Sequence, residues 1–147
     1  MRMDVSGLDE FLKSLEEATK KENMVNACIK AVNKAAPILK KSLEAEIHKA
    51  ADRGYATGAL EHSISARKAE ENEYGVFSVV GPVGADDRGV ENTDKLLWLE
   101  NGTMREGSNL MRRAGPIRHR AVWAARDKCE AIMEQEITGS IDMIFGD

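Results

Sequence analysis

Apolar residues recur at helical spacing along two long stretches of the chain. From Met24 to Ala51 they follow one another at intervals of three and four residues, and the same spacing returns from Pro116 to Ile137. This period places apolar side chains on one face of a helix, so both stretches are predicted to be long helices with one buried face. A shorter amphipathic helix is predicted from Asp4 to Lys20.

Prolines and a glycine suggest where these helices bend, begin and end. Pro37 removes a backbone donor and disfavours a helical Ala36, yet the apolar positions stay in phase on both sides of it. A kinked, nearly continuous helix is therefore favoured over two separate ones. Pro116 stands where proline is tolerated, at the first turn of the last helix. Gly139 is expected to end that helix, ahead of an apolar tail of Ile141, Ile144 and Phe145.

Between the two long helices the pattern becomes that of strands. Ile64–Ala69 and Tyr74–Gly81 are rich in β-branched and aromatic residues, and the polar run Glu70–Glu73 separates them. This arrangement predicts an antiparallel hairpin with its turn at Glu70–Glu73. A short helix, Gly58–Ser63, is expected just before it.

The apolar run that follows the hairpin ends in a strong turn signal. Lys95–Glu100 is predicted to be a third strand or a strand–helix junction, and Asn101-Gly102 then turns the chain sharply. Within the run, Leu97, Trp98 or Leu99 is expected to anchor the sheet to the long helices.

Together these elements predict an α+β fold: long N-terminal helices, a small antiparallel β-sheet and a long C-terminal helix packed on the sheet. The 147 residues are expected to form one domain, 1–147. Within it, the N-terminal helix (1–22) is expected to be loosely attached. The segments 83–94 and 103–115 are expected to be mobile loops.

Composition narrows the classes of partner and compartment. The net charge of −4 argues against a general nucleic-acid binder, whose domains are usually basic. The acidic N-terminal segment is not a signal peptide, and no apolar run approaches the roughly 20 residues that span a bilayer. No membrane contact is expected. Synthesis in a reducing cytoplasm is expected.

The sequence offers no catalytic, cofactor-binding or metal-binding constellation. His62 beside Glu61 was considered as a base, and Asp86-Asp87 as a cation site, but neither has the partners that such chemistry needs. Cys28 and Cys129 fall within predicted helices and are expected to be buried structural thiols, and a disulfide between them stays open. The protein is therefore predicted not to be an enzyme, and no cofactor is expected.

One charge asymmetry stands out after the turn at Asn101-Gly102. Between Met104 and Lys128 there are seven cations and two anions, in a chain that is acidic overall. Such a cluster indicates an anionic partner. Three alternatives stay open: an acidic surface of a neighbouring subunit, DNA phosphates, or acidic residues of this chain's own N-terminal helices (Glu10, Glu16, Glu17 and Glu22).

Three motifs, taken in order, resemble one protein family. The first is Thr57-Gly58-Ala59-Leu60 with Ser63-Ile64 after it, and the second is Glu100-x-Gly102-Thr103. The third is an arginine-rich loop followed by Pro116, which opens the final helix. Together they resemble the small tail-completion or neck proteins of long-tailed double-stranded DNA phages. The similarity extends over roughly Ala31 to Glu136.

The resemblance implies a structural role in a phage or prophage virion. Members of that family complete the head-proximal end of the tail and help join it to the head connector. The implied partners are other tail and connector proteins, with a homo-oligomeric ring on assembly; a monomeric state in isolation and contact with packaged DNA stay open. The alternative is a nucleic-acid-binding regulator that uses the arginine-rich segment 105–128.

The candidate residues follow from the motifs and the charge cluster. The residues expected at a subunit or partner interface are Glu100, Gly102, Thr103, Arg105, Arg112, Arg113, Arg118 and Arg120. The residues expected to hold the fold are Thr57, Gly58, Leu60, Trp98 and Pro116.

Overall fold

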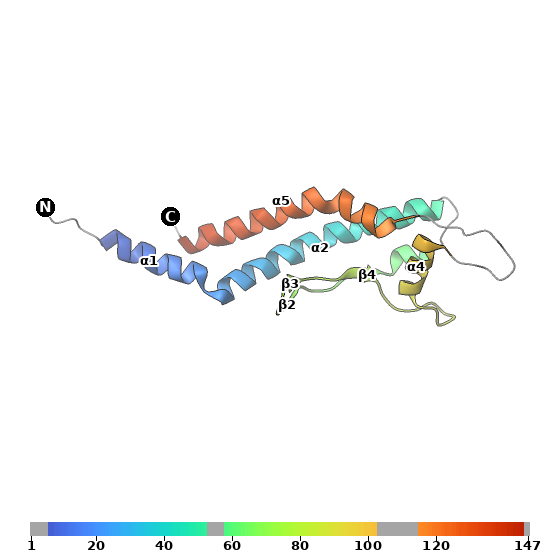
Figure 1. The fold of residues 1–147 in the computed structure, drawn as a ribbon, viewed down its shortest axis with the longest axis horizontal. Coiled ribbons are helices and arrows are strands. Elements are labelled where there is room, and N and C mark those ends of the chain that lie inside the picture. The colour runs from blue at the N-terminus through green and yellow to red at the C-terminus, as the bar shows by residue number, and fades with distance from the viewer. Residues whose placement is uncertain (1–5, 53–57, 103–114, 146–147) are drawn as a thin grey trace.

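Two long antiparallel helices set the length of the molecule. The computed structural model describes residues 6–52, 58–102 and 115–145, and in it α2 (Lys21–Asp52) lies along α5 (Ile117–Phe145). The first helix, α1 (Ser6–Thr19), extends beyond the start of α2 and contacts the C-terminal part of α5 (Figure 1). The periodicity of the sequence predicted these helices. α2 and α5 each bury one apolar face, whereas Phe11, Leu12 and Leu15 of α1 are 40–54% exposed.

The contact between α2 and α5 is built from small side chains. Five alanines at helical spacing are buried there: Ala27, Ala31 and Ala35 on α2, and Ala121 and Ala125 on α5. Small residues let two helices approach closely. Accordingly, Cys129 Sγ lies 3.6 Å from the carbonyl oxygen of Ala35, and Ser42 Oγ donates a 2.8 Å hydrogen bond to the carbonyl of Ala121.

Both long helices continue through the residues expected to interrupt them. Pro37 lies inside α2, so the prediction of a nearly continuous helix is confirmed. The predicted end at Gly139 is wrong, because α5 runs on to Phe145. A glycine inside a helix costs only about 1 kcal/mol. The spacing of Ile137, Ile141 and Ile144 carries the half-buried face of α5 past it.

The predicted hairpin is present as two short ladders. β1 (Ile64–Ala66) pairs with β4 (Val80–Pro82), and β2 (Glu70–Asn72) pairs with β3 (Gly75–Phe77), both antiparallel. Between the ladders, Lys68 and Ala69 lie opposite the single residue Ser78, as in a β-bulge. Asn33 Oδ1 on α2 accepts the N–H of Ala69 at 2.8 Å, which ties the bulge to the helix.

The hairpin turn lies later in the chain than predicted. Glu70–Asn72 is a strand, and the chain reverses at Glu73 and Tyr74. Asn72 explains the shift, because its side-chain oxygen accepts the backbone N–H groups of both Tyr74 and Gly75. Gly75 has a φ of 133°, a conformation that favours glycine.

The predicted third strand is a helix. The segment Asn92–Asn101 forms α4, and its buried residues, Asn92, Leu96, Leu99 and Glu100, follow helical spacing. Four consecutive apolar residues, Leu96 to Leu99, fit a strand or a helix equally well. Leu96 and Leu99 therefore hold α4 in place, whereas Leu97 and Trp98, also proposed as anchors, are largely exposed.

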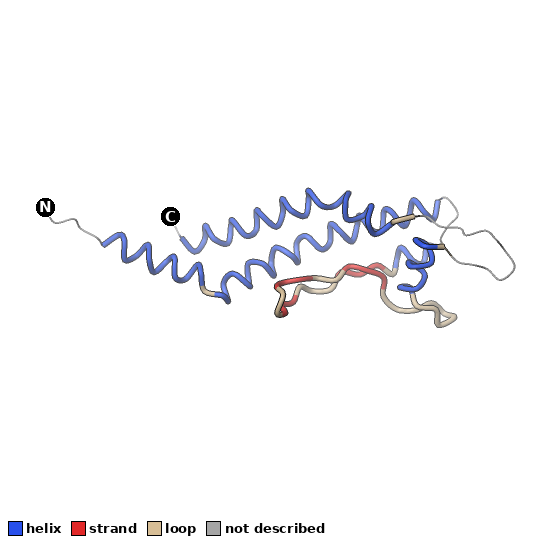
Figure 2. The backbone as a smooth tube through the Cα atoms, viewed as in Figure 1, coloured by secondary structure: helices blue, strands red, loops and turns tan. Residues whose placement is uncertain are grey.

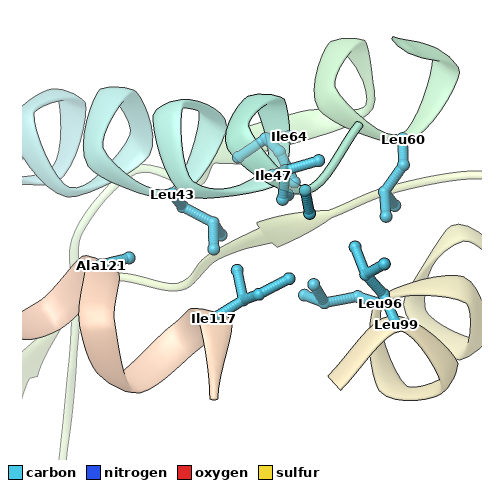
Figure 3. Packing of buried hydrophobic residues seen from close by; sticks show 9 residues of the cluster. Leu43, Ile47, Leu60, Ile64, Leu96, Leu99, Ile117 and Ala121 are labelled. Carbon is cyan, nitrogen blue, oxygen red and sulfur yellow. The ribbon is translucent and has the colours of Figure 1, made fainter. Parts of the chain in front are cut away.

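One apolar cluster joins the two long helices to β1, to α4 and to a short helix before the hairpin, at one end of the molecule. Leu43 and Ile47 of α2 meet Leu60 of α3 (Gly58–His62). Figure 3 shows these side chains converging with others of the cluster: Ile64 of β1, Leu96 and Leu99 of α4, and Ile117 and Ala121 of α5. This cluster fixes the point where α4 ends relative to the point where α5 begins.

The α+β class is confirmed, with long helices, a small antiparallel β region and a long C-terminal helix. α5 packs mainly against α2 rather than against the sheet. It is linked to β1 through the apolar cluster to which both elements contribute. The hairpin also packs on α2, so α2 lies between α5 and the hairpin (Figure 2).

Candidate functional site

The candidate interface residues that the structure describes gather where α4 ends and α5 begins. Glu100 is buried, and its Oε1 accepts the backbone N–H of Arg118 at 2.7 Å. Its Oε2 accepts the Nε–H of the same arginine, also at 2.7 Å. Glu100 thus satisfies a free N–H in the first turn of α5 and pairs with Arg118. The hydrogen bond raises the pKa of the Arg118 guanidinium.

Glycines stand on both sides of residues 103–114. Gly102 has a φ of 86° and caps α4 by donating its N–H to the carbonyl of Trp98 at 2.7 Å. Gly115, which precedes α5, has a φ of 87°. Side chains with a Cβ rarely adopt this conformation, so both positions favour glycine. The residues between them lie outside the described part of the chain, including Thr103, Arg105, Arg112 and Arg113.

A second buried carboxylate holds the next arginine. Glu46 of α2 accepts hydrogen bonds from Lys49 Nζ at 2.6 Å and from Arg120 Nε at 2.9 Å. The bond from Lys49, with that from Arg120, outweighs the effect of burial and lowers the pKa of Glu46. Glu46 was missed in the sequence, although it is an acid between Leu43 and Ile47 on a face that is otherwise apolar.

Intramolecular pairing therefore accounts for part of the basic cluster. Arg118 pairs with Glu100, Arg120 with Glu46, and Arg126 with Glu130 at 2.8 Å. These partners differ from the N-terminal glutamates, Glu10, Glu16, Glu17 and Glu22, that the sequence suggested. In the described part of the cluster, each arginine thus has a carboxylate partner in the same chain, and Arg120 shares its partner Glu46 with Lys49.

The residues expected to hold the fold differ in their surroundings. Leu60 is buried in the apolar cluster, and Gly58 begins α3. Pro116 is exposed and comes directly before α5, as predicted. Trp98 is 46% exposed, so it does not anchor α4. Thr57 lies outside the described residues.

The residues considered for catalysis have structural partners. His62 Nδ1 lies 2.7 Å from the carbonyl oxygen of Gly58 in its own helix. Asp86 Oδ1 accepts the backbone N–H groups of Arg88 and Val90, and Oδ2 lies 2.7 Å from Lys95 Nζ. These bonds, the one from Lys95 foremost, lower the pKa of Asp86 to about 2. Asp86 therefore ties the segment before α4 to that helix.

Within residues 6–52, 58–102 and 115–145 there is no disulfide and no metal-binding group of side chains. Cys28 and Cys129 are free and half-buried. The described residues contain no group of three histidine, cysteine or acidic side chains placed to hold a metal ion. Among the described helices, none combines the length and apolar character needed to cross a membrane.

The surface around Glu100 and Arg118 forms an open depression of about 620 Å³. It is lined by residues from both sides of the undescribed segment: Glu100, Asn101, Gly115, Pro116, Arg118 and His119.

Comparison with protein-family models, curated proteins and solved structures finds no match to this chain.

Proposed function

We propose that this chain is a structural subunit of a phage or prophage tail. In this role it completes the head-proximal end of the tail, helps join the tail to the head connector, and is located in the virion. It acts without a cofactor and without catalysis, through contacts with other tail and connector proteins.

The observation that carries the proposal is the convergence of the three motifs behind the resemblance. Leu60 and Ile64 from the first motif pack in the same cluster as Leu99, which precedes Glu100 of the second. Glu100 in turn pairs with Arg118, two residues after Pro116 of the third. Motifs far apart in the sequence thus support one another at a single place. This is expected of a fold that must hold the two ends of one segment together for assembly.

A binding role also suits the character of the described surface. The described residues that line the depression beside Glu100 do not bring together a nucleophile, a base and an orienting residue such as catalysis requires. The nucleic-acid alternative is less favoured, because Arg118, Arg120 and Arg126 each already pair with a glutamate of the same chain. Phosphates would have to compete with those carboxylates.

The experiment is deletion of the gene from the phage or prophage that carries it. We expect unjoined heads and tails in electron micrographs, restored to joined particles when the gene is supplied in trans. Mass spectrometry should detect the chain in purified wild-type particles. Normal particle yield after deletion, with the chain absent from virions, would exclude the proposal.

A further inference from the structure

The residue at the end of α4 is an asparagine that precedes a glycine. Asn101 is the last residue of α4, its side chain is exposed, and Asn101-Gly102 is the only Asn-Gly pair in the sequence. Asparagine is a thermolabile residue. Attack on its side-chain amide by the next backbone nitrogen is least hindered where the next residue has no Cβ. Among the asparagines of this chain, Asn101 is therefore expected to lose its amide first.

Both groups that would react are held by the last turn of α4. The N–H of Gly102 donates to the carbonyl of Trp98 at 2.7 Å, and Asn101 Nδ2 donates to the carbonyl of Leu97 at 3.0 Å. These bonds oppose the movement that brings the Gly102 nitrogen to Cγ, the side-chain carbonyl carbon of Asn101. The folded turn is therefore expected to slow the reaction.

The same turn has little apolar surface to keep it closed. The two residues whose carbonyls accept these bonds are largely exposed, Leu97 at 37% and Trp98 at 46%. Local opening costs little free energy where it uncovers few buried contacts, and helix ends open most readily. Asn101 and Gly102 can therefore leave the turn while Leu99 stays packed in the apolar cluster.

We propose that Asn101 is a site of spontaneous deamidation that is gated by the last turn of α4. When this turn opens, the Gly102 nitrogen gives up its proton to solvent and attacks Cγ of Asn101. A bond forms between that nitrogen and Cγ, the Cγ–Nδ2 bond breaks, and the amide group leaves as ammonia. One water molecule then opens the cyclic imide. Hydrolysis at Cγ gives aspartate, and hydrolysis at the main-chain carbonyl carbon gives isoaspartate.

The product places a negative charge where α4 ends. The C-terminus of a helix disfavours an anion, because its unpaired carbonyl groups already carry partial negative charge. The new carboxylate also lacks the N–H that Asn101 donates to Leu97. Asn101 lines the same depression as Glu100 and Arg118, so deamidation is expected to loosen the end of α4 beside that ion pair. This chemistry belongs to the chain itself and does not depend on the proposed function.

Peptide mass spectrometry of the purified full-length chain measures the reaction. During incubation in mildly alkaline buffer, Asn101 should be deamidated at least about tenfold faster in guanidinium chloride than in the folded chain. Asn72 is the internal reference, because it is exposed but is followed by Glu73, and it should react far more slowly than Asn101 in the denaturant. Equal rates at Asn101 in the folded and unfolded chain would overturn the gating. An unmodified Asn101 in the unfolded chain would overturn the site itself.

Two substitutions at Leu97 test whether opening of the turn sets the rate. Leu97→Gly and Leu97→Ala both remove the apolar side chain, but glycine also disfavours the helix, by roughly fivefold in an equilibrium constant. Asn101 should therefore react roughly fivefold faster in folded Leu97→Gly than in folded Leu97→Ala. In guanidinium chloride the two rates should be the same. Circular dichroism shows that both variants are folded, and equal rates in the two folded variants would overturn the proposal.

The effect of the product is tested by Asn101→Asp against Asn101→Gln, which keeps a neutral amide. At neutral pH the melting temperature of Asn101→Asp should be the lower of the two. The difference should shrink as the pH falls below about 4, where an aspartate becomes protonated. If Asn101→Asp is as stable as Asn101→Gln at neutral pH, the proposed loosening of α4 is overturned.

Discussion

Two buried glutamates each hold one arginine at the beginning of α5. Glu100 holds Arg118 where α4 meets α5, and Glu46 holds Arg120 between α2 and α5. Each carboxylate is buried, whereas each guanidinium reaches solvent. The glutamates therefore position the beginning of α5 relative to the rest of the molecule.

Replacing Glu100 should destabilise the fold. Glu100→Ala removes both bonds to Arg118 and leaves the backbone N–H of Arg118 without that acceptor. Because the Arg118 side chain is more than half exposed, water screens part of the ion pair, and we expect a loss of about 1–3 kcal/mol in the free energy of unfolding. Urea denaturation measures it. The control is Glu130→Ala, which breaks an exposed pair and should change stability by less than about 0.5 kcal/mol. Equal effects from the two variants would contradict this role for Glu100.

Asp86 should make stability depend on pH in the acid range. Its folded pKa of about 2 lies below the unfolded value of about 3.9. A carboxyl group whose pKa is lower in the folded than in the unfolded chain stabilises the fold at pH values above its unfolded pKa. This stabilisation is lost as the pH falls from about 4 to about 2. Wild type should therefore be more stable than Asp86→Asn at pH 5, and the difference should shrink toward pH 2. Thermal melts across this range test it, with Asp142→Asn as an exposed control. A difference that stays constant with pH would argue against Asp86 as its source.

The sequence pointed to residues of the candidate site, but it did not show which of them bond to each other. Glu100 and Arg118 were both named as interface residues, but nothing in a linear pattern shows that they bond to each other across 18 positions. Glu46 and Arg120 are 74 positions apart, and their meeting depends on how α2 and α5 pack.

At the scale of elements, apolar periodicity predicted the helices correctly where it continued over many turns. The extent of α2 and the start of α5 follow from apolar spacing sustained over many turns, whereas the end of α5 was predicted too early, at Gly139. The run Leu96 to Leu99 was too short to distinguish a strand from a helix, and the fit of Leu96 and Leu99 into the apolar cluster decided the outcome. The hairpin turn was shifted by the side-chain bonds of one residue, Asn72.

Gly102 should be intolerant of a side chain. Gly102→Val forces a β-branched residue to a φ of 86°, at a cost of about 1–3 kcal/mol. We expect it to misdirect the segment that follows α4 and to impair particle assembly, while circular dichroism retains most of the helical signal. Gly81→Val is the matched control, because a Cβ there meets open space and its φ is not positive. A Gly102→Val chain that assembled normally would show that this turn does not direct the segment.

The alanine contact between α2 and α5 should not accept larger residues. Ala31 is buried at the close approach of the helices, so Ala31→Leu is expected to cost about 1–3 kcal/mol through overpacking. Ala45→Leu places the same residue on an exposed position of α2 and should be nearly neutral. Urea denaturation of both variants separates packing from helix propensity. Similar stability of the two would mean that the helices can move apart at no cost.

At the scale of the whole molecule, the layers are thin. In the described part of the chain, α2 has α5 on one side and the hairpin on the other. The apolar cluster is confined to one end, and the exposed apolar residues are distributed along the outer surfaces. Stability of the isolated chain is therefore expected to be modest.

The pairing of α2 with α5 has a consequence for the order of folding. Lys34 pairs with Glu136, 102 positions later, whereas the hairpin contacts α2 within a shorter span of chain. During synthesis α2, the hairpin and α4 leave the ribosome before α5 does. The buried alanines of α2 thus have no partner helix until α5 emerges. Because a domain folds as a unit, the packing of α5 on α2, rather than formation of the hairpin, is expected to be the step that completes the fold.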